Sequence, residues 1–251
     1  MKSVLAVNNL SKHFDGTVAL DGFSCAFEAG RITSLIGPNG AGKTTLFNAI
    51  CGFVEPETGE VYHDSTPICR LKPCKRARLG IGRTFQDLRL IGRMSALENV
   101  MLASPRQLGE NIAHAILRLP PQRTQERKNR AEAERLLEYV GLAEKRDDLA
   151  ETLSYGQQKL LTLASCLASG AEVLLLDEPV AGVNPELIPK ILDILTDLAN
   201  KGKTVVFIEH NLEVVTKIAH TVIFMDVGQK VDEGPPERIR NNPRVIEAYI
   251  E

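Results

Sequence analysis

Runs of apolar and β-branched residues alternate along the chain with stretches in which apolar residues recur at helical spacing. Residues 31–37 (RITSLIG) form one such run and lead into a glycine-rich turn. Residues 44–52 (TTLFNAICG) then have helical spacing and a closing glycine. A short apolar run is typical of a buried strand, and a period of about 3.6 residues is typical of an amphipathic helix. The alternation of the two predicts an α/β protein with layered strands and helices.

Further runs of the same kind predict more buried strands along the chain. They are residues 81–85 (IGRTF), 172–179 (EVLLLDEP), 203–210 (KTVVFIEH) and 220–226 (HTVIFMD). Residues 227–234 (VGQKVDEG) have the character of a short hairpin. A last helix is expected to begin with Asn242 as its N-cap and Pro243 at its first position.

The pattern becomes mostly helical between residues 86 and 153. Helices are predicted at residues 95–104, 111–117 and 124–140. Pro105 and the pair Pro120–Pro121 separate these segments, because proline interrupts a helix interior. A helical insert is therefore expected to interrupt the α/β core.

Composition adds mainly exclusions to this picture. The chain has 251 residues, of which 43% are hydrophobic and 25% charged, as in an ordinary globular protein with a sizeable core. The formal net charge of −2 provides no overall basic field, so nucleic acid is not expected as a partner.

The cysteine pattern and the hydropathy indicate in which compartment the chain would lie and whether it could cross a membrane. The five cysteines are scattered without a zinc-ligand spacing, and we expect free thiols in a reducing compartment. The N-terminus has no secretory signal pattern. The most apolar stretch, residues 160–176, is too interrupted to span a bilayer, so any membrane part would belong to another chain.

Residues 37–45 (GPNGAGKTT) match the phosphate-binding pattern G-x-x-x-x-G-K-[ST] between a predicted strand and a predicted helix. Gly40 and Gly42 let the backbone curl so that N–H groups point at phosphate oxygens. The helix start adds its positive dipole end. Lys43 would reach the β- and γ-phosphates, and the Thr44 hydroxyl suits Mg²⁺. The loop predicts a nucleotide site.

Two carboxylates, Asp177 and Glu178, follow the apolar run VLLL at the end of a predicted strand. Ligands bind at the carboxyl ends of strands in open parallel sheets. Asp177 would hold Mg²⁺ directly or through water, and Glu178 would orient and deprotonate a water attacking the γ-phosphate. A solvated strand end is the alternative, and the phosphate loop earlier in the chain favours the catalytic interpretation.

His210 and Gln86 also end predicted strands, and their roles stay open on the residues alone. His210 would either contact the γ-phosphate or serve as a structural hydrogen-bonding group. Gln86 would either contact Mg²⁺ or the attacking water, or would simply begin a loop.

Together these motifs resemble the ATP-binding cassette (ABC) ATPases in order and spacing, over nearly the whole chain. The matching motifs are the phosphate loop, TFQ at 84–86, LSYGQ at 153–157, LLLDEP at 174–179 and IEH at 208–210. The resemblance implies a P-loop NTPase with a RecA-like core, an N-terminal antiparallel β part and an inserted helical subdomain. Within one domain, 1–251, the core would be 1–87 and 165–234, the helical subdomain 88–164, and a C-terminal helical tail 235–251.

The resemblance also assigns residues to ATP and Mg²⁺. Phe14 matches the aromatic that stacks on adenine, with Val18 beside it, although a core phenylalanine is an alternative. The phosphates would be bound by Asn39, Gly40, Ala41, Gly42, Lys43, Thr44 and Thr45. Mg²⁺ would be held by Thr44, Gln86 and Asp177. The catalytic residues would be Glu178, His210, Gln86 and Lys43.

In this family LSYGQ corresponds to a signature that contacts the γ-phosphate bound by a second cassette. Ser154, Gly156 and Gln157 would act there in trans. Ser154 is a good N-cap, and the helix dipole attracts phosphate. Tyr155 replaces the usual glycine, so we expect a backbone conformation that tolerates a side chain. Asn184 stands where many members have aspartate.

Several features resemble the ATPase subunits of branched-chain amino acid importers and their urea and amide relatives. They are Tyr155, Asn184, the long insert at 104–134 and the closing IEAYIE at 246–251. This implies an ATP-hydrolysing motor at the cytoplasmic face of the cell (inner) membrane, held there by two integral membrane permease subunits. A second ABC ATPase subunit, identical or a paralogue, completes the sites, and a periplasmic or extracellular solute-binding protein takes part indirectly.

Alternative functions are the ATPase of an exporter or lipid extractor, and a soluble ABC protein of translation or DNA repair. Residues 87–102, which mix arginines with aliphatics, are the expected docking surface for a membrane subunit, unless those aliphatics are buried. A basic set would form a solvated face or, as a minority alternative, contact anionic lipid. It consists of Arg70, Lys72, Lys75, Arg76 and Arg78.

Overall fold

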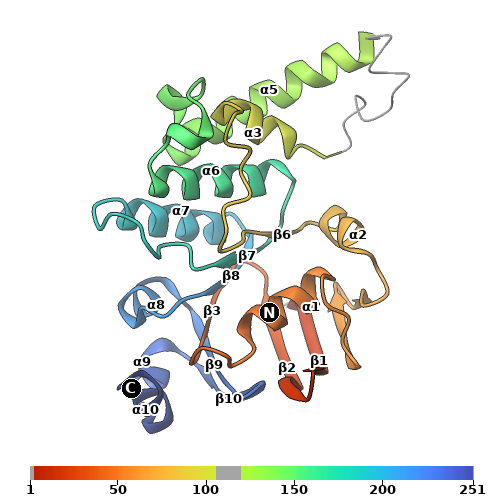
Figure 1. Ribbon diagram of the computed structural model, residues 1–251, viewed down its shortest axis with the longest axis vertical. Coiled ribbons are helices and arrows are strands. Elements are labelled where there is room, and N and C mark those ends of the chain that lie inside the picture. The colour runs from red at the N-terminus through yellow and green to blue at the C-terminus, as the bar shows by residue number, and fades with distance from the viewer. Residues whose placement is uncertain (1–2, 106–119, 251) are drawn as a thin grey trace. The chain divides into compact units, whose positions relative to one another are not determined.

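The structure is a computed structural model that describes residues 3–105 and 120–250 (Figure 1). The chain divides into two units by its internal contacts. The first contains Met1–Arg83, Glu172–Ala181 and Ile188–Glu251, and the second contains Thr84–Ala171 and Gly182–Leu187. The second unit is thus formed by segments inserted into the first.

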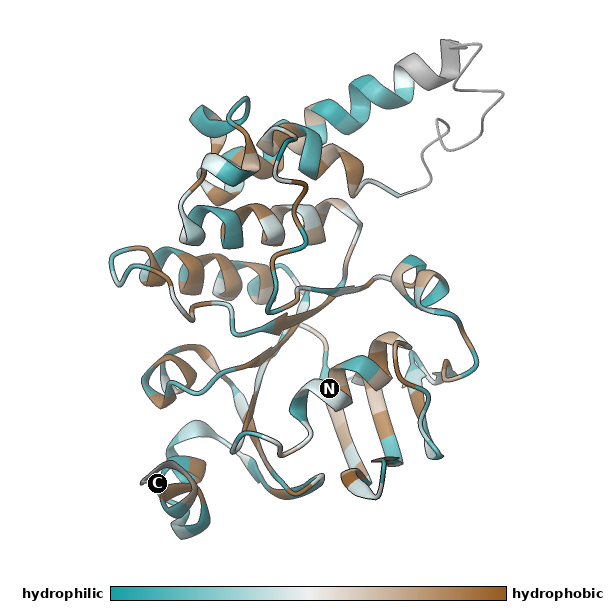
Figure 2. Cartoon of the chain, viewed as in Figure 1, coloured by the Kyte–Doolittle hydropathy of each residue, from teal (hydrophilic) through white to brown (hydrophobic). Residues whose placement is uncertain are grey.

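A six-stranded sheet organises the first unit, in the order β10-β9-β3-β8-β7-β6. Every neighbouring pair is parallel except the β9–β10 hairpin. The strands are β3 (Ile32–Ile36), β6 (Ile81–Arg83), β7 (Val173–Asp177), β8 (Thr204–Ile208), β9 (Thr221–Asp226) and β10 (Gln229–Gly234). All residues of β3, β7 and β8 are buried, and most of them are apolar, as expected for strands covered on both faces; Figure 2 colours the chain by hydropathy.

The strands and hairpin predicted in this region are present, and several are shorter than predicted: β7 covers 173–177 of the predicted 172–179, and β8 covers 204–208 of the predicted 203–210. The strand predicted at 81–85 ends at Arg83. β6 is an edge strand that pairs only with β7, and the chain passes into the second unit after Arg83. No partner strand therefore extends the ladder to residues 84 and 85.

The N-terminal part forms an antiparallel sheet in the order β2-β1-β4-β5. Its strands are β1 (Ser3–Phe14), β2 (Thr17–Glu28), β4 (Thr58–His63) and β5 (Thr66–Pro67). One buried core joins residues of β1, β2 and β4 to helix α1 (Lys43–Cys51) and to β3, β7, β8 and β9. α1 is therefore fixed between the two sheets.

The other helices of the first unit are α2 (Pro73–Arg78), α7 (Ile188–Asn200), α8 (Leu212–Ile218), α9 (Pro236–Arg240) and α10 (Pro243–Ile250). The last one begins as predicted, since Asn242 Oδ1 accepts a hydrogen bond from Arg244 N at 3.0 Å. All five cysteines are free thiols, as predicted.

Three helices pack together in the second unit: α3 (Ala96–Leu102), α5 (Pro120–Val140) and α6 (Tyr155–Ala168). Short 3₁₀ turns, η2 (Ala143–Lys145) and η3 (Ala150–Thr152), connect α5 to α6. Ser95 and Glu98 cap α3 reciprocally, which confirms the predicted helix start. Among the described residues, no helix is long and apolar enough to cross a membrane.

The helix predicted at 124–140 is longer than expected, because α5 begins at Pro120. Pro120 and Pro121 were expected to separate helices. They instead occupy the first turn, where a missing N–H has no intrahelical partner to lose. The helix predicted at 111–117 lies outside the described residues.

Arg76 in α2 is buried, with 2% of its surface exposed, and its guanidinium donates to four backbone carbonyls. Those of Ala49 and Ile50 belong to the last turn of α1, at 2.6 and 2.8 Å. Those of Cys69 and Leu71 precede α2, at 2.7 and 2.9 Å. A cation here satisfies carbonyls that end a helix and interacts favourably with its dipole.

The basic set around α2 is therefore only partly a solvated face. Arg70, Lys72, Lys75 and Arg78 are exposed, as predicted. The expectation is wrong for Arg76, which turns inward because the end of α1 offers it carbonyl acceptors. The αL residue Gly52 leaves room for it, since a Cβ at Gly52 would lie 2.8 Å from Arg76 Nε.

Replacing Arg76 with lysine should destabilise the protein. One ammonium cannot reach carbonyls on both sides of a guanidinium, and each buried acceptor left without a donor costs about 1–3 kcal/mol. We expect the free energy of unfolding, measured by urea denaturation, to fall by about 3 kcal/mol. Arg78→Lys, on the exposed side of the same helix, is the control and should show no measurable loss. Equal stability of the two variants would contradict the capping role of Arg76.

Candidate functional site

The loop at residues 37–42 connects β3 to α1 and depends on its glycines. A Cβ at Gly37 would lie 2.0 Å from Met225 O, and one at Gly42 would lie 2.1 Å from Ala19 O. Both residues also have positive φ, 148° and 97°. Backbone from β9 and β2 therefore closes directly on the loop, and no larger side chain fits at these positions.

Lys43 is the first residue of α1, and its side chain is folded back into the loop. Its Nζ donates to Gly37 O at 2.7 Å and to Pro38 O at 2.8 Å, and the residue is only 6% exposed. Burial lowers the Lys43 pKa, and the nearby charges of Glu178 and Asp177 oppose that shift. The lysine of the loop and the acidic pair thus share one electrostatic environment.

The start of α1 is also suited to an anion. Gly42 is the N-cap of α1 and has no side chain that could cap the first N–H groups of the helix. Thr44 and Asn39 are exposed beside it, whereas Ala41 is buried. A helix N-terminus that lacks a side-chain cap and lies beside a lysine is suited to bind a phosphate.

Asp177 ends β7, where its backbone is in register with Ile208 of β8. Glu178 then adopts a positive φ of 48° and donates its N–H to Ile208 O at 3.1 Å. A non-glycine residue in this region costs about 1–3 kcal/mol, and such strained residues often occur at functional sites. The turn directs two successive carboxylates differently.

His210 lies beside Glu178, with 3.4 Å between His210 Nε2 and Glu178 Oε1. The two side chains come from the ends of adjacent strands, β8 and β7, and both are partly exposed. The structure therefore brings together Lys43, Asp177, Glu178 and His210, which are far apart in the sequence.

Glu209 is a further residue of this site that the sequence analysis missed. It is 3% exposed, and its two carboxylate oxygens accept hydrogen bonds from the backbone N–H groups of Val180 and His210, each at 3.2 Å. Burial, together with the Glu178 charge, raises the Glu209 pKa. Glu209 fixes the turn after the acidic pair. Its only signal in the sequence is a charged residue directly after an apolar strand.

Phe14 and Val18 belong to the β1–β2 hairpin and are 44% and 36% exposed. Lys12 Nζ lies 5.3 Å from the Phe14 ring centroid. The alternative that Phe14 is a core residue is wrong, because nearly half of its surface is exposed.

The second unit carries the LSYGQ turn. Ser154 is the N-cap of α6, and Ser154 and Gln157 form a reciprocal capping box. Tyr155 has a helical conformation, which confirms the expectation of a backbone that tolerates a side chain. A Cβ at Gly156 would lie 2.6 Å from Leu187 Cδ2, so this glycine packs against the 182–187 loop of its own unit.

Gln86 belongs to the second unit and is exposed in a bend shortly after β6. In the predicted docking segment Ile91 and Leu102 are exposed, whereas Leu97 and Val100 are buried. The segment therefore contains both surface and core aliphatics, and its docking role stays a prediction.

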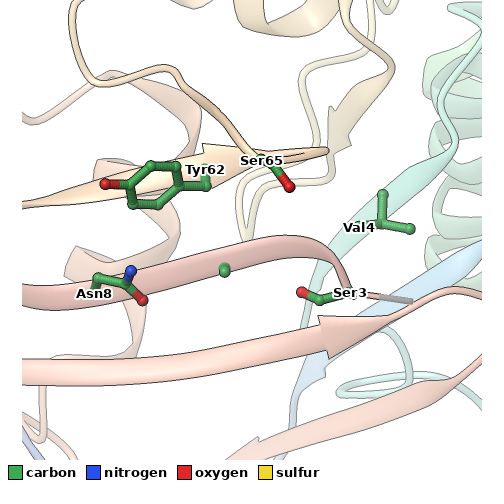
Figure 3. Close-up of a pocket in the computed structure, with 6 residues that line it drawn as sticks. Ser3, Val4, Asn8, Tyr62 and Ser65 are labelled. Atoms are coloured by element: carbon green, nitrogen blue, oxygen red, sulfur yellow. The ribbon is translucent and has the colours of Figure 1, made fainter. Parts of the chain in front are cut away.

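One pocket of the described residues lies away from the predicted site. Figure 3 shows a pocket of about 260 Å³ on the antiparallel sheet that contains none of the predicted site residues. It is lined by Ser3, Val4, Ala6, Asn8, Tyr62 and Ser65. In residues 3–105 and 120–250, no group of three or more His, Cys, Asp or Glu residues could hold a metal.

Comparison with known proteins decides the family. Residues 20–181 match the family model described as ABC transporter. The chain belongs to this ABC transporter family. Residues 233–250 also match a model described as branched-chain amino acid ATP-binding cassette transporter. The predicted P-loop ABC ATPase fold and the resemblance to importer ATPases are thereby confirmed.

Relatives match over nearly their full length. The high-affinity branched-chain amino acid transport ATP-binding protein BraF of Pseudomonas aeruginosa is 38% identical, over 99% of this chain and 98% of that protein. The corresponding protein LivG of Escherichia coli is 36% identical, over 98% and 97%.

Solved structures of ATP-binding cassettes have the same fold as this chain. A nucleotide-free ATP-binding cassette from an ABC transporter matches with a TM-score of 0.86 at 33% identity, over 100% of both chains. The ADP conformation of such a cassette also has a TM-score of 0.86, over 100% of this chain and 99% of that chain. The protein is therefore an ABC ATPase of the transporter type.

Glu209→Gln should slow this ABC ATPase without preventing nucleotide binding. Glutamine has one acceptor oxygen, so either Val180 N or His210 N loses its partner and the turn carrying Glu178 shifts. Misplacement by about 1 Å can cost up to about 100-fold in rate, and we expect a loss of at least roughly tenfold. The measurement is phosphate release at saturating Mg²⁺-ATP.

Glu213→Gln, an exposed change in the first turn of α8, is the control and should retain the wild-type rate. A wild-type rate in Glu209→Gln would show that the turn does not depend on this carboxylate.

Proposed function

We propose that the protein is the ATP-hydrolysing motor subunit of an importer for branched-chain or other small amino acids or related amides. The observation that carries the proposal is the convergence of Lys43, Asp177, Glu178 and His210 at the phosphate loop. The class of cargo rests on the relatives and on the match at residues 233–250.

In this proposal ATP binds with its adenine on Phe14, next to Val18. The phosphates bind to the backbone N–H groups of the loop and to the side chains that follow it. These residues are Asn39, Gly40, Ala41, Gly42, Lys43, Thr44 and Thr45. Lys43 exchanges its contacts with Gly37 O and Pro38 O for phosphate oxygens, which return a full counter-charge to the buried ammonium.

Thr44, Asp177 and Gln86 would hold Mg²⁺, which neutralises charge on the β- and γ-phosphate oxygens when bound. The hydroxyl and carboxylate oxygens suit a hard cation. Glu178 orients the attacking water and accepts its proton, and His210, 3.4 Å away, keeps this carboxylate in place and contacts the γ-phosphate.

Ser154, Gly156 and Gln157 are proposed to complete the site of a second cassette in trans, through the N-terminus of α6. The second cassette is an identical chain or a paralogue. Closure of the pair would drive two integral membrane permease subunits at the cytoplasmic face of the membrane, with a solute-binding protein outside. Residues 88–164 would be the helical subdomain that transmits this closure, 1–87 and 165–234 the core, and 235–251 a helical tail.

Replacing Glu178 with glutamine should prevent hydrolysis, so that ATP stays bound and the two cassettes stay associated. An amide cannot accept the proton, and loss of a general base costs about 10²–10⁴ in rate. We expect stable dimers that retain ATP, measured by light scattering and by analysis of the bound nucleotide. Glu172→Gln, an exposed change just before the same strand, should behave like wild type. Hydrolysis at the wild-type rate in Glu178→Gln would refute the assignment of the base.

The transport function is tested by cross-linking tagged Glu178→Gln protein in ATP-loaded native membranes. Two polytopic subunits and a second cassette should co-purify, and the ligand of their binding protein can then be assayed. Recovery of ribosomal or DNA-repair proteins without a membrane chain would instead support the soluble alternative.

A further inference from the structure

Arg83, the last residue of β6, has a nearly buried guanidinium that joins three elements. Its Nη2 lies 3.5 Å from Asp177 Oδ2, and the two side chains are 5% and 7% exposed. Its Nη1 donates to Asn48 Oδ1 in α1 at 2.6 Å. The guanidinium carbon lies 5.7 Å from the centroid of the Phe47 ring, also in α1.

This guanidinium is fixed on both sides. Arg83 is in register with Leu175, two residues before Asp177, and therefore reaches toward the carboxyl end of β7. On the α1 side it also acts on Cys51: burial raises the pKa of that thiol to about 11, and Arg83 opposes the shift. The side chain is thus a bridge from Asp177 to the helix that follows the phosphate loop.

Such a buried ion pair needs an explanation other than stability. Desolvation of two buried charges largely cancels their attraction, and hydrophobic replacements of similar volume are often equally stable. A planar guanidinium does, however, fix the direction of each acceptor it contacts. Here one acceptor is the carboxylate proposed to hold Mg²⁺, and the other is attached to the phosphate-binding helix.

We infer that Arg83 is a positioning residue for the metal–nucleotide complex: it orients the Asp177 carboxylate relative to α1. The inference rests on the proposed role of Asp177. Partners that orient a metal ligand typically contribute 10–100-fold to metal affinity. Because Gln86 follows three residues later, the same bridge fixes the point from which that segment of chain leaves the sheet.

The test separates metal affinity from nucleotide affinity. Arg83→Lys keeps the positive charge but cannot contact Asp177 and Asn48 with a rigid fork. Mn²⁺ binding to the ATP-loaded protein is measured by electron paramagnetic resonance, and ATP binding without metal is measured by calorimetry. We expect about tenfold weaker Mn²⁺ binding, with metal-free ATP affinity within about twofold of wild type. Arg31→Lys, whose partner Glu28 lies at the surface, is the control and should change neither.

A second variant tests the same bridge in case Arg83→Lys impairs folding. Asn48→Ala removes the α1 end of the bridge without changing any charge, and it should weaken Mn²⁺ binding by about threefold. The double variant should be no weaker than Arg83→Lys alone, because both changes break one bridge.

Three outcomes would overturn the inference. Unchanged Mn²⁺ affinity in Arg83→Lys and Asn48→Ala would show that Asp177 needs no orienting partner. Equal losses of metal-free and metal-dependent binding, accompanied by a lower melting temperature, would assign Arg83 a purely structural role. If ATP binding by the wild-type protein did not respond to Mn²⁺, the proposed metal site itself would fail, and the Arg83 inference with it.

Discussion

A buried ammonium surrounded by main-chain carbonyls is the constraint on which the first unit depends. Lys43 is held by Gly37 O and Pro38 O, and this position is possible only because glycine backbone lies directly against β2 and β9. Burial of a charge is tolerated when it is paired and hydrogen-bonded. The positions of the two sheets and of α1 are therefore constrained. A shift of any of them would expose the Lys43 ammonium to solvent or leave it without its hydrogen-bond acceptors.

The acidic groups that end or follow β7 and β8 are each held by different partners. Asp177 is paired with Arg83, Glu178 is placed by a strained turn and lies beside His210, and Glu209 accepts two backbone N–H groups. Like charges so close together would repel one another without these partners. The arrangement places three carboxyl groups close together while leaving Glu178 partly exposed.

Much of this could be predicted from the sequence, because the decisive signals are local. The apolar runs of β3, β7 and β8 follow from burial on both faces of a parallel sheet, and the glycine spacing of the phosphate loop follows from backbone geometry. The convergence of Asp177, Glu178 and His210 follows from the rule that parallel strands end at one edge.

The sequence-based predictions missed or misjudged features that depend on contacts between distant segments. Arg76 resembles its exposed neighbours in sequence, and only the end of α1 makes it a buried cap. Glu209 lies in an ordinary strand-end position, and its burial depends on Val180 from another segment. The early end of β6 reflects its edge position, which no local pattern encodes.

After the acidic pair, the chain passes from the first unit into the second unit within a few residues. Only three residues separate Glu178, in the first unit, from Gly182, which belongs to the second unit and lies against the ring of Tyr155. Glu178 and the residue that contacts the Tyr155 ring therefore lie on one short continuous segment of the chain, although they belong to different units.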